Sequence, residues 1–120
     1  MKLWAIRGAI TVPEDTPGAV KEATGLLLQE LIRLNSIGGG EIVSIIFTAT
    51  EDIRSEFPAV AARELGLNDT PLICAREIPK PGALPLCIRV LIHFYTPLAK
   101  EELKPVYLRE AVKLRPDLAL

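Results

Sequence analysis

Arginine inside apolar segments is the feature of this sequence most suggestive of chemistry. Arg89 lies in the middle of the run LCIRVLIHFY at residues 86–95, and Arg7 lies near the end of KLWAIRGA at residues 2–9. A buried guanidinium is costly without a partner, so Arg89 needs either an internal carboxylate or an anionic ligand. Two arginines so placed suit a small dianion, because each can grip a carboxylate through two N–H groups. Pairing of each arginine with a glutamate for structural reasons is the alternative, and spacing alone leaves both open.

Other kinds of site find little support in the sequence. The two cysteines, Cys74 and Cys87, lie in apolar segments typical of small buried residues and form no CxxC pair. The single histidine, His93, leaves too few ligands for a zinc site and reads as a plain strand residue. The glycines at 38–40 precede a strand and lack the lysine of a phosphate-binding loop. We therefore expect neither a metal nor a cofactor.

Composition indicates one globular domain spanning residues 1–120. The chain has 49% hydrophobic and 24% charged residues, which is ordinary for a soluble protein. Its 14 basic and 15 acidic residues form no basic patch, which argues against a nucleic-acid partner. No apolar stretch reaches the roughly 18 residues of a membrane span, and MKLWAIRG lacks a signal peptide's apolar core. We expect a cytoplasmic protein with no membrane association.

Four strands are predicted, at residues 2–9, 41–48, 71–77 and 86–95. In the last of these the even-numbered residues are uniformly apolar and should face the core, while Arg89 lies on the other face. The tail contains a mixed segment around residues 106–108 and then becomes irregular.

Two helices are predicted between these strands. Asp15 or Thr16 can cap the first, and Pro17 suits its first position. An apolar stripe at helical spacing follows, formed by Val20, Ala23, Leu27, Leu31 and Leu34. Pro58 opens a short second helix that Gly66 can end. The predicted class is α/β (α+β), a small mixed sheet with one long and one short helix packed on it.

Several blocks of this sequence resemble the monofunctional chorismate mutases of the Bacillus type, the AroH class. They are IRGAITV near the start, FPAVAARELG in the centre, the segments ICARE and CIRVLI, and the closing VYLREAVKLRPDL. The blocks occur in the family's order and nearly span the chain. CIRV together with the closing block is the most specific part of the match.

The resemblance implies an isomerase that converts chorismate to prephenate, the step toward phenylalanine and tyrosine, with no cofactor, metal or covalent intermediate. It also implies a barrel-like homotrimer with active sites in the clefts between subunits. The reaction breaks an ether C–O bond while a C–C bond forms, through a polarised, chair-like transition state. The enzyme must therefore hold the reactive conformer and stabilise charge where it develops.

The same match implies roles for individual residues. Arg89 would face the ether oxygen, on which negative charge grows, and Glu77 would lie near the ring hydroxyl. Arg7 and Tyr107 would bind substrate carboxylate, and Cys74 would form a hydrogen bond beside Glu77.

Further lining residues follow from the match. They are Ile73, Cys74, Ala75 and Arg76 from the third strand, Phe57, Ala59 and Arg63 from the adjacent subunit, and Leu114 and Arg115 from a brief tail over the entrance. Val60 stands where some members have a lysine, so Arg63 would carry more of the entrance charge. Cys74 and Glu77 are three positions apart and would face opposite sides of a regular strand. Both can line one pocket only if the strand twists, bulges or ends near residues 75–76.

A different class of function fits the same arginines. A non-catalytic trimeric module could hold a small anionic metabolite in its subunit clefts. Glu77 discriminates between the two, because a binder of dianions gains nothing from a carboxylate that faces its ligand, whereas the rearrangement does.

Overall fold

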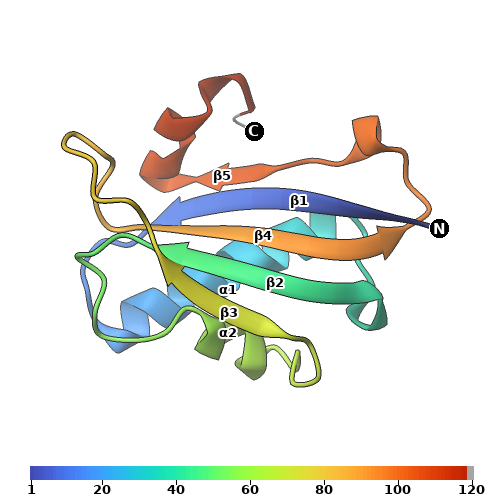
Figure 1. The fold of residues 1–120 in the computed structure, drawn as a ribbon, viewed down its shortest axis with the longest axis horizontal. Coiled ribbons are helices and arrows are strands. Elements are labelled where there is room, and N and C mark those ends of the chain that lie inside the picture. The colour runs from blue at the N-terminus through green and yellow to red at the C-terminus, as the bar shows by residue number, and fades with distance from the viewer. Residues whose placement is uncertain (119–120) are drawn as a thin grey trace.

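The computed structural model describes residues 1–118 as a five-stranded sheet with two α-helices (Figure 1). The strands are β1 (Lys2–Thr11), β2 (Ile42–Ala49), β3 (Leu72–Arg76), β4 (Cys87–Thr96) and β5 (Val106–Leu108), and the helices are α1 (Pro17–Leu34) and α2 (Ala59–Glu64). Short 3-10 segments are η1 (Gly39–Glu41), η2 (Lys100–Glu102), η3 (Arg109–Leu114) and η4 (Pro116–Leu118). Within this part of the chain, no helix is both long and apolar enough to cross a membrane.

The sheet is mixed, as the sequence predicted. Its order is β3-β2-β4-β1-β5. Strand β4 runs antiparallel to both β1 and β2, while β1 pairs with β5, and β2 with β3, in parallel. The four predicted strands lie within one or two residues of the observed bounds. Strand β5 was predicted only as a mixed segment, because three residues are too few to show alternation and its partner lies far away in the sequence.

Both helices pack on one face of the sheet, and the main core lies between them and the strands (Figure 1). The even-numbered residues of β4, from Ile88 to Phe94, are buried as predicted. Thr16, rather than Asp15, caps α1, and its side chain accepts a hydrogen bond from the Ala19 N–H at 3.2 Å. The predicted stripe of α1 is buried except for Leu34, which is half-buried. Gly66, with φ of 91°, follows the end of α2 as expected.

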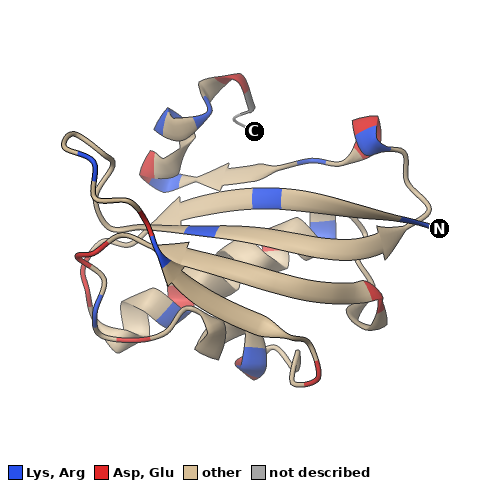
Figure 2. Cartoon of the chain, in the orientation of Figure 1, with Lys and Arg blue, Asp and Glu red and all other residues tan. Residues whose placement is uncertain are grey.

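Within residues 1–118, the opposite face of the sheet is covered only at one end. There η3 packs over a small second cluster formed by Ala9, Cys87, Tyr107 and Ala111. Arg7 and Arg89 lie on the rest of this open face, and Figure 2 shows basic residues on β1 and β4 amid long uncharged stretches of strand. The expectation that Arg89 is buried is wrong for the single chain, in which its side chain is 50% exposed. Its partners must come from this open face.

Close packing of α1 on the sheet requires a glycine in β1. A Cβ on Gly8 would lie 2.9 Å from the Leu31 Cδ1 atom and 2.9 Å from the backbone oxygen of Val106. The second contact is with the backbone of β5, which cannot move away as the end of a side chain can. Gly8 therefore permits both the approach of α1 and the pairing of β5 with β1.

We predict that Gly8→Ala lowers the free energy of unfolding by about 1–3 kcal/mol, the usual cost of overpacking a core. Urea denaturation at one fixed protein concentration measures it. Gly25→Ala is the matched control, because its Cβ would meet no atom within 4 Å, and replacing a glycine inside a helix should stabilise by about 0.5–1 kcal/mol. Equal stability of Gly8→Ala and the wild type would contradict this account of the packing.

Candidate active site

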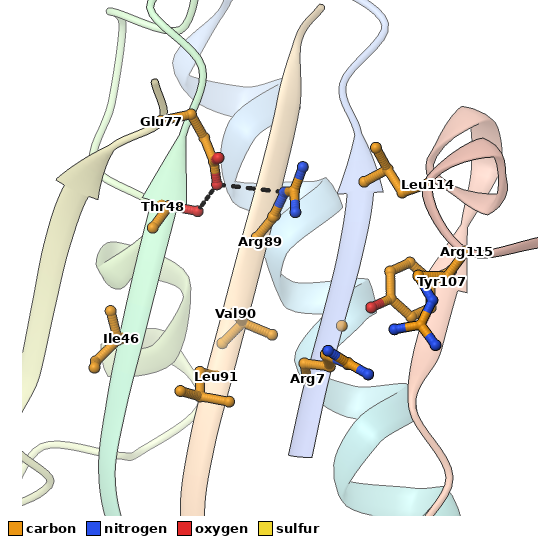
Figure 3. Close-up of a pocket in the computed structure, with 11 residues that line it drawn as sticks. Arg7, Ile46, Thr48, Glu77, Arg89, Val90, Leu91, Tyr107, Leu114 and Arg115 are labelled. Carbon is orange, nitrogen blue, oxygen red and sulfur yellow. Dashed lines mark hydrogen bonds and ion pairs between the residues drawn. The ribbon is translucent and has the colours of Figure 1, made fainter. Parts of the chain in front are cut away.

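A cavity of about 360 Å³ lies on the open face of the sheet, beside η3. Strands β1, β2, β4 and β5 contribute to it, together with Glu77, which follows β3, and with Leu114 and Arg115 at the end of η3 (Figure 3). Its lining residues are Arg7, Gly8, Ile46, Thr48, Glu77, Arg89, Val90, Leu91, Tyr107, Leu114 and Arg115. Six residues expected at the site therefore meet in one place: Arg7, Glu77, Arg89, Tyr107, Leu114 and Arg115.

One side of the cavity is formed by an ion pair between Arg89 and Glu77. The Arg89 Nε atom lies 3.3 Å from a Glu77 carboxylate oxygen, and the Thr48 hydroxyl donates a hydrogen bond to the same oxygen (Figure 3). The register explains this contact, because Thr48 on β2 pairs directly with Arg89 on β4. Strand β3 ends at Arg76, and the Glu77 N–H then donates to the Ala49 carbonyl at 3.0 Å. Of the three alternatives left open for this segment (a twist, a bulge or an end near residues 75–76), the structure shows the end of the strand, one residue before the predicted bound.

The other side of the cavity is basic and phenolic. Arg7 from β1 lies near Tyr107 and Arg115 in the close-up (Figure 3). Tyr107 is only 6% exposed, because its ring belongs to the second cluster under η3. Arg115 donates two hydrogen bonds to Asp117, at 3.2 and 2.9 Å, and these bonds lower the pKa of the Asp117 carboxyl. The cavity is thus lined by three guanidinium groups, those of Arg7, Arg89 and Arg115, and by one carboxylate, that of Glu77. This excess of positive charge suits an anion with more than one negative group.

Comparison with known proteins identifies the family of this chain. A sequence model of the family described as chorismate mutase type I matches residues 3–118. The chain belongs to this family. It is 53% identical over 114 residues to the protein named chorismate mutase AroH of Thermus thermophilus, covering 94% of this chain and 93% of that protein. It is 38% identical over 121 residues to the Bacillus subtilis protein of the same name, covering 100% and 95% respectively.

A solved structure agrees with the sequence matches. The chain resembles a chorismate mutase from Clostridium thermocellum with a TM-score of 0.89 and 45% sequence identity, over 90% of this chain and 96% of that one. The small α+β domain with one mixed sheet is therefore the fold of the chorismate mutase family, whose members are isomerases.

The remaining residues expected from the chorismate mutase resemblance do not line this cavity. Phe57, Cys74, Ala75 and Arg76 line a second cavity of about 380 Å³ near the start of α2. Ile73 is 60% exposed on the open face, Arg63 is exposed on α2, and Ala59 is buried. Within one chain the expected residues thus fall into two separate groups.

Two residues of β3 have contacts of their own within the single chain. Cys74 pairs with the buried Phe47 and packs against the main core, on the helix-covered side of the sheet. Within the single chain it does not lie beside Glu77, because Glu77 follows the strand's end and returns toward the open face. Arg76 is used structurally: its Nη1 donates to the carbonyls of Thr50 and Ile53, at 2.7 Å each.

Thr48 lines the cavity, and the sequence interpretation missed it. Its contact with Glu77 depends on the pairing of β2 with β3, which a single sequence does not reveal. The only available signal was a hydroxyl at the end of the otherwise apolar segment IIFT, residues 45–48.

Cys87 is buried beside the site, and its surroundings do not favour a role as a nucleophile. It is 2% exposed, and burial raises the pKa of its thiol to about 11, despite an opposing effect from Arg89. At pH 8 only about one thiol in a thousand would be ionised, and the thiolate is the reactive form.

We predict that Cys87 resists a thiol reagent in the native chorismate mutase. A Cys74→Ala variant leaves Cys87 as the only thiol of the chain, and it should release almost no chromophore from an aromatic disulfide reagent at pH 8. One thiol per chain should react after addition of denaturant, which serves as the internal control. Fast, stoichiometric reaction of the native variant would show that Cys87 is accessible and ionised, contrary to this assignment.

Proposed function

We propose that the cavity on the open face binds chorismate and converts it to prephenate by electrostatic and conformational stabilisation of the transition state. One observation carries the proposal. The Arg89 Nε atom and a Glu77 carboxylate oxygen lie 3.3 Å apart on one side of the cavity. Arg7, Tyr107 and Arg115 line the other side. This arrangement offers both signs of charge at separate points, which a polarised rearrangement uses and simple capture of a dianion does not.

Arg89 would act on the bond that breaks. As the ether C–O bond opens, negative charge grows on its oxygen, and a guanidinium held in place lowers the energy of that charge. The contact with Glu77 uses the Nε atom of Arg89, which leaves the two terminal nitrogens to donate to the ether oxygen and a substrate carboxylate. Half of the side chain is exposed, so these nitrogens can reach the cavity.

Glu77 would stabilise the positive character that develops on the ring. Its carboxylate stays in place because the Thr48 hydroxyl and Arg89 contact the same oxygen, so the second oxygen can face the ring hydroxyl. Arg7 and Tyr107 would hold substrate carboxylate on the far side, with Arg115 above them. No proton is transferred in this scheme, so we expect turnover to vary little across neutral pH.

We further propose that the enzyme is a homotrimer that completes each site with the second group of residues from a neighbour. The open face carries exposed apolar side chains, including Leu3, Ile73 and Tyr95 at 48%, 60% and 45% exposure, which a partner subunit would cover. Phe57 is 67% exposed at the edge of the second cavity. Contact between the two groups across a subunit boundary would bring Phe57, Ala59 and Arg63 to the substrate. The cytoplasmic location expected from the sequence is also part of this proposal.

The experiment that tests the function is the ultraviolet absorbance of chorismate mixed with the purified protein. Catalytic amounts should remove the chorismate signal steadily and produce prephenate. Tight binding of chorismate without any loss of signal would contradict the proposal and favour the alternative, a trimeric module that only binds an anionic metabolite.

We predict that Arg89→Ala folds but loses most of its turnover. Losing one preorganised donor costs about 3–4 kcal/mol, or roughly a hundred- to thousand-fold in kcat, and a charged donor should cost at least as much. Arg89→Lys keeps the charge but loses the two-pronged geometry, and it should remain severely impaired. Arg33→Lys is the control, because within residues 1–118 the Arg33 side chain pairs only with Glu30 on the same helix. Near-normal turnover of Arg89→Lys would show that charge alone suffices.

We predict that light scattering gives three chains per particle, and that activity per chain falls when dilution dissociates the particle. Each site would then lose the neighbour that supplies Phe57 and Arg63. Sedimentation at the assay concentration is the control, because it measures how many chains the active particle contains. A monomer with full activity at working dilution would refute the shared site.

A further inference from the structure

The strand ends beside the cavity are tied together by the loop at residues 50–53, which follows β2. The Thr50 N–H donates to the Cys87 carbonyl at 3.1 Å, and the Cys87 N–H donates to the Thr50 hydroxyl oxygen at 3.0 Å. The Thr50 hydroxyl in turn donates to the Asp52 carboxylate at 2.5 Å. Arg76, at the end of β3, holds the same loop through the carbonyls of Thr50 and Ile53. One short loop thus joins the ends of β2 and β3 to the start of β4.

Asp52 also holds the residue that precedes β4. Its two carboxylate oxygens accept the Leu86 N–H at 3.0 and 3.2 Å. Leu86 has φ of 50°, in the left-handed region that a residue with a bulky side chain avoids. Its carbonyl accepts a hydrogen bond from the Val12 N–H at 2.8 Å. A conformation of this kind persists only where its surroundings enforce it, and here Asp52 and Val12 hold Leu86 from both sides.

The conformation of Leu86 decides how β4 begins. Residues 77–86 connect β3 to β4 and contain prolines at 79, 81 and 85, none of which can donate a backbone hydrogen bond. Cys87 starts the strand, and Arg89 follows on the same face, opposite Thr48. A shift of one residue at this entry would turn Arg89 toward the core. Even a small displacement would change the distance from Arg89 to Glu77.

We propose that Asp52 is a positioning residue for Arg89. It acts through Leu86 and Cys87: within residues 1–118 its carboxylate accepts hydrogen bonds only from the Leu86 N–H and the Thr50 hydroxyl. It lines a separate cavity beside Glu77, outside the substrate cavity. The inference rests on the proposed function, since it assigns Asp52 a part in the rearrangement.

Kinetics of Asp52→Ala test this role. Turnover per folded enzyme should fall roughly ten- to hundred-fold, the scale on which small misplacement of a catalytic group acts, and kcat should fall by a larger factor than KM rises. Asp52→Asn should recover most of the loss, because its amide oxygen can still accept the Leu86 N–H. Glu51→Ala is the matched control in the same loop, since within residues 1–118 its carboxylate makes no hydrogen bond or ion pair, and it should behave as the wild type.

Two further comparisons separate positioning from general stability. Thr50→Val removes the hydroxyl that links Asp52 to Cys87 and should reproduce the loss, whereas Thr50→Ser keeps the hydroxyl and should not. In an Arg89→Lys background, Asp52→Ala should cost less than about threefold, because the two-pronged geometry is already lost.

The outcomes are distinguishable. If the wild type does not convert chorismate, the proposed function fails before Asp52 is considered. If the wild type is active and folded Asp52→Ala and Thr50→Val match it, the positioning role is refuted. An equal fold-loss of turnover from Asp52→Ala in the wild type and in the Arg89→Lys background would also refute it, because Asp52 would then act on the fold as a whole.

Discussion

The antiparallel pairing of β4 with β2 is the constraint on which the site depends. It places Arg89 directly opposite Thr48, whose hydroxyl binds Glu77, so a cation, an anion and a hydroxyl meet on one face of the sheet. Because side chains alternate along a strand, the register that buries Ile88 and Val90 also turns Arg89 toward the cavity. Packing of the apolar core and placement of the charged group are therefore consequences of one alignment.

The rest of the fold supports that face and leaves it accessible. Both helices cover the other side of the sheet, with α1 brought close by Gly8. On the open side, η3 covers only one end, where the cluster around Tyr107 and Ala111 fixes the basic side of the cavity. Exposing a partly apolar sheet face to water is unfavourable for a monomer, and we therefore propose that a neighbouring subunit covers it. The exposure of Arg89 in a single chain has the same origin.

Local patterns in the sequence predicted the parts of the structure that depend on near neighbours. Alternation predicted the buried face of β4, and capping chemistry predicted Gly66 at the end of α2 and narrowed the start of α1 to Asp15 or Thr16. The resemblance to a family placed Arg7, Glu77, Arg89 and Tyr107 at one site, and the cavity brings these four together. Strand β5, the contact of Thr48 and the packing of Cys74 against the core could not be foreseen, because they depend on pairing between distant segments. The contacts of Arg76 could not be foreseen for a related reason: its carbonyl partners belong to a loop more than twenty residues earlier in the chain.

The central claim is that the Arg89–Glu77 pair stabilises the transition state more than it binds the substrate. The most direct test is Glu77→Gln, which retains the shape of the side chain and removes its charge. Single-turnover loss of chorismate absorbance gives the rate of the chemical step, and titration with prephenate gives affinity. The account predicts that the rate falls by about tenfold or more while the affinity changes by less than about threefold. A weaker affinity with an unchanged chemical rate would contradict it.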